Sequence, residues 1–416
     1  MRHYFYLDKI QIMMSAPKTI SLLILSFLAV ALTAQDYKLT PSKEDNISRN
    51  TADQLLNQSG QLNIGGYAQI DYNQPLSSTQ FNKGKLDIHR LVLLFGYRFD
   101  KRASFVTEIE FEHVKEVFVE QAFLNYRINK SLNFRAGLLL IPMGIMNEYH
   151  EPPTYNGVER PNLDKYIVPT TWRELGAGFT GRIDALSLRY QVYLINGFNG
   201  YDGTAKFTGQ NGLRSGRQKG AESFTSAPNF SAKVDYYGIS GLKIGLAGYF
   251  GDSQTTLYDG IDKVDVAAIS RADSTVVGIS MLGIDARYNI KGFRLRGQYN
   301  FVNLSNTSAY NNFTGNNVGS QLSGFYLEAA YNVLQQKKDI TDELLPFFRF
   351  EKYNTHQSVA RNIEVNNAFE RTELTAGIGW KINAGTMLKI DYQWLKSDAD
   401  DSFKNQLNIG VGIWFF

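Results

Sequence analysis

Acidic side chains at every second position mark the first place in the chain where charge could act on a solute. In residues 105–112 the carboxylates Glu108, Glu110 and Glu112 alternate with Thr107 and apolar residues. A β-strand puts alternate residues on opposite faces, so these three carboxylates share one face. Ionised carboxylates at this density cannot face lipid, and that face is therefore predicted to meet water.

Basic residues in neighbouring segments supply the opposite charge: Arg90, Arg135, Arg160, Lys165 and Arg173. Arginines that face carboxylates across a channel create a transverse electric field and a narrow wet constriction, whereas rings of one sign would select ions. We therefore predict that these five residues and the three glutamates line a pore. The alternative for any single arginine is a place at the rim, where its guanidinium would bind lipid headgroup phosphates.

Residues for other chemistry are scarce. The chain has no cysteine and only five histidines, which excludes disulfides and cysteine-based sites. No His-Glu-x-x-His motif occurs, and no serine–histidine pair indicates a nucleophile with an oriented base. A water-facing strand explains the cluster of Glu110, Glu112 and His113, although residues 148–151 (Glu-Tyr-His-Glu) could bind a divalent ion. We expect no enzyme, no metal site and no cofactor.

Three more basic residues lie in the glycine-rich stretch 209–220: Arg214, Arg217 and Lys219. The stretch lacks the strand-to-helix context of a phosphate-binding loop. We predict an external loop that attracts anionic solutes or lipopolysaccharide, or is simply solvated.

The elements that must position these residues are strands. From residue 61 onward the sequence alternates with a period of two and is interrupted by turn residues. We predict sixteen strands, to within two. Their spans are 61–73, 85–99, 102–113, 117–128, 131–141, 174–184, 186–198, 228–238, 241–251, 276–290, 292–304, 320–334, 343–354, 371–383, 385–397 and 405–416.

Connections between these strands alternate in length. Short ones are 184–186, 238–241, 290–292 and 383–385, and long ones are 142–173, 199–227, 252–275, 305–319 and 355–370. Short turns on one rim and long loops on the other are typical of outer-membrane β-barrels. An even number of strands lets both termini lie on the short-turn side.

The longest connection, 142–173, holds five of the ten prolines. Proline removes a donor and fixes φ, so this stretch is not a regular strand. Long loops in compact folds are usually functional. We predict that it is the barrel's third loop, folds into the barrel and constricts it. The alternative is an external loop packed against a neighbouring subunit.

The two ends of the chain support export to an outer membrane. Lys18 precedes the uncharged stretch 19–33, and small residues follow it. This pattern predicts a cleaved signal peptide over 1–34, because the stretch is short for a retained anchor helix. Residues 35–60 are polar and aperiodic, which indicates a flexible periplasmic leader. The last strand has one apolar face and ends on Phe416, as final strands of outer-membrane barrels usually do.

Composition narrows the remaining choices. Without residues 1–34 the chain has 40 basic and 39 acidic side chains, a net charge of +1, and no basic run, so no nucleic-acid partner is expected. A soluble β-solenoid or pair of β-sandwiches would also alternate. Neither would need the signal, the terminal phenylalanine and the alternating loop lengths together. We predict an all-β, transmembrane antiparallel β-barrel over 61–416.

Short motifs resemble the phosphate-selective porin O and P family. Residues 135–144 (Arg-Ala-Gly-Leu-Leu-Leu-Ile-Pro-Met-Gly) resemble the strand that leads into that family's third loop. Residues 173–178 (Arg-Glu-Leu-Gly-Ala-Gly) are similar to the segment after the loop, and 89–93 to the second strand. Leu140 stands where the family often has lysine, and Met143 where it has an aromatic residue.

This resemblance spans 61–416 and implies a sixteen-stranded, trimeric porin, with Arg90, Arg135 and Arg173 in the lumen or constriction. Residues and resemblance together predict passive diffusion of small hydrophilic solutes across the outer membrane of a Gram-negative cell. Anions such as phosphate are the expected preference. The alternatives are a surface adhesin or assembly partner without transport, and an outer-membrane enzyme.

Overall fold

The computed structural model describes residues 50–337, 340–361 and 363–415. The predicted signal peptide 1–34 and residues 35–49 of the predicted leader lie outside these residues, as does Phe416.

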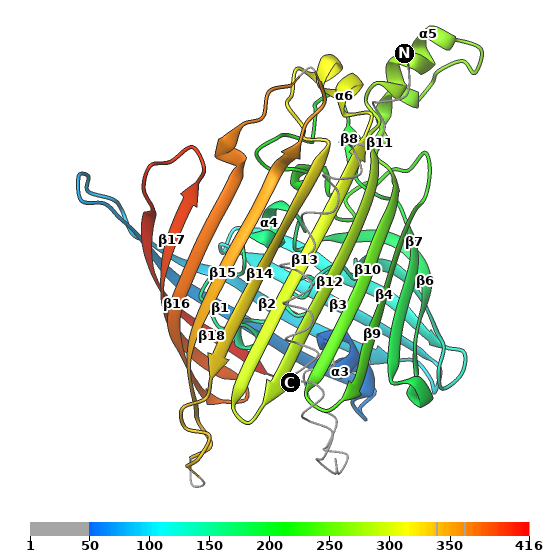
Figure 1. Ribbon diagram of the computed structural model, residues 1–416. Coiled ribbons are helices and arrows are strands. Elements are labelled where there is room, and N and C mark those ends of the chain that lie inside the picture. Colours follow the sequence, from blue (N-terminus) through cyan, green and yellow to red (C-terminus); the bar gives the residue numbers. More distant parts are fainter. Residues whose placement is uncertain (1–49, 338–339, 362, 416) are drawn as a thin grey trace, which may run out of the picture. The chain divides into compact units, whose positions relative to one another are not determined.

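Sixteen antiparallel strands form one closed barrel (Figure 1). They are β1 (Leu62–Leu76), β2 (Lys85–Arg98), β3 (Ala103–Glu112), β4 (Glu116–Arg127), β5 (Asn133–Leu140), β6 (Arg173–Ile183), β7 (Leu188–Ile195), β9 (Asn229–Ile239), β10 (Leu242–Asp252), β12 (Gly278–Ile290), β13 (Phe293–Ser305), β14 (Gln321–Tyr331), β15 (Glu343–Ser358), β16 (Glu370–Asn383), β17 (Thr386–Ser397) and β18 (Lys404–Phe415). The predicted fold class is confirmed, and each predicted strand is present.

The barrel closes where its first and last strands pair. β1 and β18 run antiparallel, with Gly66 opposite Phe415 and Leu76 opposite Asn405. Closure leaves no sheet edge with unpaired backbone groups, and each such group would cost several kcal/mol in hydrocarbon.

Side chains alternate between the two faces of the wall. In β12, Met281 is 0% and Asp285 3% exposed, whereas Leu282 is 52% and Ile284 50% exposed. The buried face thus carries both polar and apolar side chains, whereas the outer face is apolar, and lipid can cover it. No helix in the described part of the chain is both long enough and apolar enough to cross a membrane.

Connections differ at the two rims. β12 and β13 are joined by Lys291 and Gly292, both with positive φ (46° and 86°), as a two-residue type I′ hairpin requires. The opposite rim carries longer connections, which contain the helices α5 (Val266–Asp273) and α6 (Thr307–Thr314) and the small parallel pair β8 (Asn199–Tyr201) and β11 (Gln254–Thr255). A 3-10 turn, η3 (Asp184–Leu186), forms the short connection between β6 and β7. Two further 3-10 turns, η5 (Thr256–Tyr258) and η6 (Asn367–Phe369), lie in longer connections.

A short helix precedes the barrel. α3 (Thr51–Asn57) lies at the short-turn end (Figure 1). Its N-terminus is capped by Asn50, whose Oδ1 accepts a hydrogen bond from the Asp53 amide at 2.9 Å. Leu55 is buried, and the helix contacts β2 and β3. The polar, aperiodic sequence of 35–60 had not indicated a helix in its described part.

Buried charge fixes α3 in place. Asp53 forms ion pairs with Arg135 at 3.0 Å and Arg189 at 3.2 Å. Burial opposes ionisation of this carboxyl, but attraction by Arg189 and Arg135 outweighs it and holds the pKa of Asp53 below its ordinary value.

Candidate functional site

The connection between β5 and β6 is buried along most of its length. Residues 141–172 contain η2 (Pro152–Thr154) and α4 (Leu163–Tyr166). Nine large apolar side chains of the segment are at most 1% exposed: Ile141, Met143, Ile145, Met146, Val158, Leu163, Ile167, Val168 and Trp172. Trp172 stacks on Phe198 with ring centroids 4.6 Å apart. Each such side chain contributes roughly 1.5–3 kcal/mol by burial, so the segment has a core of its own.

Polar contacts tie this segment to strands around the whole barrel. The Ile145 amide donates to Gln298 of β13 at 2.7 Å, and the Val158 amide donates to Asp391 of β17 at 2.6 Å. The segment's carbonyl oxygens accept bonds as well. Lys233 of β9 donates to Gly144 and Lys389 of β17 donates to Gly157, each at 2.9 Å. The buried polar face of the wall therefore finds its partners in this one connection.

Carboxylates of the segment join the same network. Glu148 lies 3.0 Å from Lys233 and 3.3 Å from Arg189. Burial opposes its ionisation, but these two cations hold the pKa of Glu148 well below its ordinary value. Glu148 is therefore ionised at neutral pH, and its ion pairs attach the connection to β7 and β9.

A second connection, between β7 and β9, packs against the first. Arg214, in η4 (Arg214–Gly216), donates to the Thr170 carbonyl at 2.7 Å. Arg217 donates to the Thr171 carbonyl at 2.8 Å and the Pro169 carbonyl at 3.1 Å. These bonds to carbonyl oxygens orient both guanidinium groups without neutralising them.

Two β-bulges shape the wall opposite these connections. The β1–β2 register shifts so that Gln69 faces Arg90 and Ile70 faces Ile88, which leaves His89 as an extra residue. The β3–β4 register shifts likewise, and Glu120 is the extra residue there. A bulge lets two successive side chains turn toward the same face. Glu120 and Gln121 are accordingly both buried.

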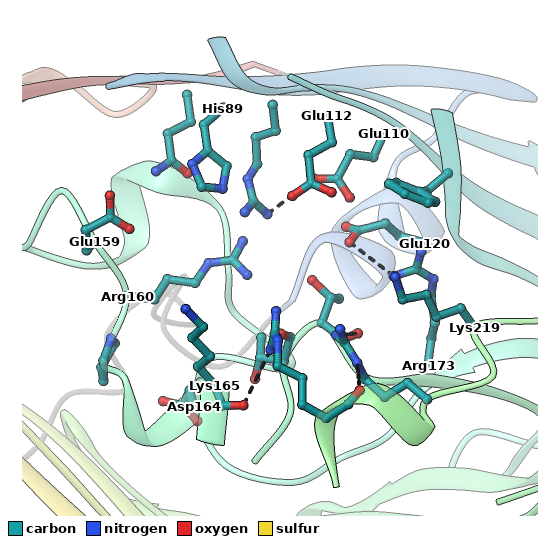
Figure 2. A pocket seen from close by; sticks show the side chains of 18 of the residues that line it. His89, Glu110, Glu112, Glu120, Glu159, Arg160, Asp164, Lys165, Arg173 and Lys219 are labelled. Carbon is teal, nitrogen blue, oxygen red and sulfur yellow. Dashed lines mark hydrogen bonds and ion pairs between the residues drawn. The ribbon is translucent and has the colours of Figure 1, made fainter. Parts of the chain in front are cut away.

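The wall and the two connections enclose a cavity of about 300 Å³ (Figure 2). Seven cations line it: Arg90, Arg160, Lys165, Arg173, Arg214, Arg217 and Lys219. Five carboxylates line it as well: Glu110, Glu112, Glu120, Glu159 and Asp164. In Figure 2, Glu110, Glu112 and His89 lie on one side, and Arg160, Lys165 and Asp164 lie on the other.

Only two of these cations have carboxylate partners within the cavity lining. Arg90 lies 3.5 Å from Glu110, and Arg173 lies 3.6 Å from Glu120. Among the described residues, no carboxylate lies within the 4.0 Å ion-pair limit of the remaining five: Arg160, Lys165, Arg214, Arg217 and Lys219. With seven cations against five carboxylates, the lining carries a formal excess of two positive charges.

The pKa values of the second connection reflect this excess. Burial, together with the positive charges of Arg214 and Arg173, lowers the pKa of Arg217 to about 9. Burial and Arg217 lower the pKa of Lys219 as well. The lowered pKa values mean that burial and neighbouring positive charge make the charged forms of Arg217 and Lys219 less favourable, and a bound anion would offset this effect.

Six of the eight predicted pore residues meet at this cavity: Arg90, Arg160, Lys165, Arg173, Glu110 and Glu112. The structure places the other two elsewhere. Arg135 is buried against α3, where it pairs with Asp53. Glu108 is buried too and accepts hydrogen bonds from Tyr67 at 2.9 Å and Gln121 at 2.7 Å.

Several lining residues were not predicted. Arg214, Arg217 and Lys219 had been noted as a basic cluster but assigned to an external loop. His89 and Glu120 reach the cavity through bulges, which strict alternation cannot reveal. Glu159 lines the cavity next to the predicted Arg160, in the same connection.

Comparison with known proteins places the chain in a family. No model of a known protein family matches the sequence. An uncharacterised protein of Aquifex aeolicus (strain VF5) is 32% identical over 365 residues, which cover 85% of this chain and 80% of the relative. The chain belongs to that protein's family.

Solved structures share the fold at low sequence identity. The outer membrane channel DcaP of Acinetobacter baumannii has a TM-score of 0.55 at 12% identity, covering 85% of this chain and 97% of DcaP. OmpF of Salmonella typhi, solved in complex with daunomycin, has a TM-score of 0.54 at 13% identity, covering 85% and 97%. OmpTdeltaL8, from an outer membrane protein of Vibrio cholerae, has a TM-score of 0.53 at 11% identity, covering 86% and 100%. At such identities the likeness shows the barrel fold alone.

Proposed function

We propose that the protein is a porin of the outer membrane, through which small hydrophilic solutes diffuse passively. Residues 141–172 would lie inside the barrel as its long third loop, and the 300 Å³ cavity would be the narrowest part of the path. Their contacts with β9, β13 and β17 support this placement, because these strands lie on different parts of the wall.

The observation that carries the proposal is the charge arrangement around the cavity. Seven cations and five carboxylates line the cavity, and five of the cations have no carboxylate partner within 4.0 Å. Such a site attracts anions into a narrow wet space and holds them against a transverse field. We therefore infer a preference for anions, with phosphate-like ions as the expected solutes, and a place in the phosphate-selective porin O and P family.

The remaining parts of the proposal follow from the same fold. Apolar residues on the outer face suit lipid, so we place the protein in the outer membrane, reached with a cleaved signal peptide. Three copies would form a trimer. The protein would act without a cofactor and without catalysis.

Bilayer conductance tests the function directly. The purified protein, added to a planar lipid bilayer in KCl, should give current steps of uniform size. A purified, folded protein that gives no steps would contradict the porin and favour the adhesin or assembly role.

Removal of three of the unpaired positive charges should weaken the preference for anions. In a KCl gradient, Arg214→Gln/Arg217→Gln/Lys219→Gln should shift the reversal potential toward cations and lower the chloride-to-potassium permeability ratio several-fold. Raising the pH from 7 to 10 should move the unaltered protein in the same direction. The reason is that Arg217, whose pKa lies at about 9, and Lys219, whose pKa is also lowered, lose protons over this range.

A charge-matched control separates local from general effects. Lys263, Arg271 and Arg361 are exposed and lie outside the cavity lining. Changing these three residues to glutamine should leave the reversal potential unchanged. Equal shifts from both triple variants would show that the cavity does not set the selectivity.

A further inference from the structure

Four potential metal donors from four separate elements converge next to the cavity, and one of them, Glu120, belongs to its lining. Glu108 comes from β3, Glu120 from the bulge in β4, His150 from the connection 141–172 and Tyr67 from β1. Each is at most 1% exposed. Donor atoms of Glu108, Glu120 and His150 all lie within 4.8 Å of one another.

Their spacing matches a coordination shell. His150 Nε2 lies 3.4 Å from Glu108 Oε1 and 3.3 Å from Glu120 Oε2. The Tyr67 hydroxyl lies 2.9 Å and 3.3 Å from the same two oxygens. Zinc bonds to nitrogen and oxygen of about 2.0–2.2 Å put the corners of a tetrahedron about 3.3–3.6 Å apart. The donors already stand at nearly these separations.

Neighbouring groups would orient the ligands. Gln121 donates to Glu108 Oε2 at 2.7 Å, which leaves Oε1 directed at the cluster. Arg173 pairs with the other oxygen of Glu120 at 3.6 Å. Such outer contacts are what fix carboxylate ligands around a metal. In the described part of the chain, His150 Nδ1 is buried without a hydrogen-bond partner, so the wall does not fix this ring through its second nitrogen.

We propose that Glu108, Glu120 and His150 bind a divalent first-row transition metal such as Zn²⁺, with the Tyr67 hydroxyl or a water as fourth donor. One imidazole with two carboxylates is a donor set that Zn²⁺ accepts. Glu120 also lines the cavity, where Figure 2 shows its ion pair with Arg173, and this gives the metal a route of entry. His150 belongs to the 148–151 segment that the sequence singled out, but its partner ligands come from the wall.

A bound metal would act as a clamp. It would link β3 and β4 to the connection that carries His150, and so hold one edge of the cavity in a fixed position. This role is independent of whether the barrel conducts solutes, since it concerns only how the connection is fixed to the wall.

Metal binding is tested with the full chain purified in detergent and stripped with a chelator. Calorimetric titration with ZnCl₂ should show one saturable site per chain. His150→Gln and Glu120→Gln should each weaken binding at least about 100-fold, and Gln121→Ala about 10–100-fold. His89→Gln and Glu112→Gln serve as controls, because both residues line the cavity but lie outside the cluster. Both variants should bind zinc as tightly as the unaltered protein does.

A measurement on the unaltered chain covers the case in which variants fail to fold. X-ray absorption at the zinc edge should show one imidazole and otherwise oxygen donors. Absence of a saturable site, loss of binding in the His89 and Glu112 controls, or a zinc shell without imidazole would each overturn the proposal.

Discussion

Replacing residues 145–169 with a short glycine–serine linker should raise single-channel conductance several-fold. The expectation rests on the proposed place of this segment inside the lumen. A barrel of sixteen strands is wide enough to leave an aqueous channel unless something fills it. The variant removes Arg160 and Lys165 from the cavity, so ion selectivity should weaken along with the rise in conductance.

The barrel should survive this change. Its hydrogen-bond ladder runs strand to strand around the closed sheet and does not involve the segment. Buried side chains such as Lys233 and Asp391 would lose their partners in the segment, but water entering the lumen would hydrate them. The conductance is measured in planar bilayers after heat-dependent gel migration confirms folding.

A second connection provides the control. Residues 258–273 include α5, which projects beyond the long-connection end in Figure 1, and line no part of the cavity. Replacing them with the same linker should leave conductance unchanged. If the 145–169 variant also conducts as the unaltered protein does, that segment does not form the narrowest point.

The strands were predictable because each one obeys a local rule. In β18 the sequence puts Ile409, Ile413 and Phe415 on one face and Asn408 on the other, and the structure exposes the first three and buries the last. Lipid outside and polar groups inside enforce this alternation at every second residue. Closure of the sheet then follows from pairing with β1.

The cavity was predictable only in part, because it depends on departures from that rule. Arg90, Glu110 and Glu112 follow the alternation and were assigned to the water-facing side. Glu120 reaches the cavity through a bulge, and no local pattern marks where a register shifts. The sequence of the neighbouring strand β3 does not indicate this register shift either.

Contacts between connections were the least predictable. Arg214 and Arg217 take their positions from carbonyl oxygens of Thr170 and Thr171, which lie 44 and 46 residues away in the chain. Arg135 was predicted to line the pore, but a neighbouring element covers it. Its strand face follows from alternation, but α3 and Asp53 cover it, and the composition of residues 35–60 gave no sign of a helix.

Breaking the buried ion pairs of Arg349 should destabilise the protein strongly. Arg349 has no exposed surface; its Nε lies 2.9 Å from Glu351 and its Nη1 3.4 Å from Glu328. It also donates to the Glu159 carbonyl at 3.3 Å. Arg349→Met should lower the free energy of unfolding by about 3–5 kcal/mol, because removing one partner leaves a buried charge uncompensated. Urea unfolding in lipid vesicles, followed by tryptophan fluorescence, measures this change.

The charge that loses compensation is Glu351, since Glu328 keeps a bond from Arg296 at 2.6 Å. Arg349→Met/Glu351→Gln should therefore recover most of the lost stability, because an amide oxygen can still accept the bond that the Leu163 amide now donates to Glu351 at 3.1 Å. On the same strand, Lys352 pairs with Glu370 at 2.7 Å, with side chains that are 44% and 30% exposed, and Lys352→Met should cost at most about 1 kcal/mol. Equal losses from Arg349→Met and Lys352→Met would mean that burial adds nothing to the pair. If the double variant recovers no stability, the lost free energy of unfolding comes from the hydrogen bond to the Glu159 carbonyl, which joins β15 to the connection 141–172.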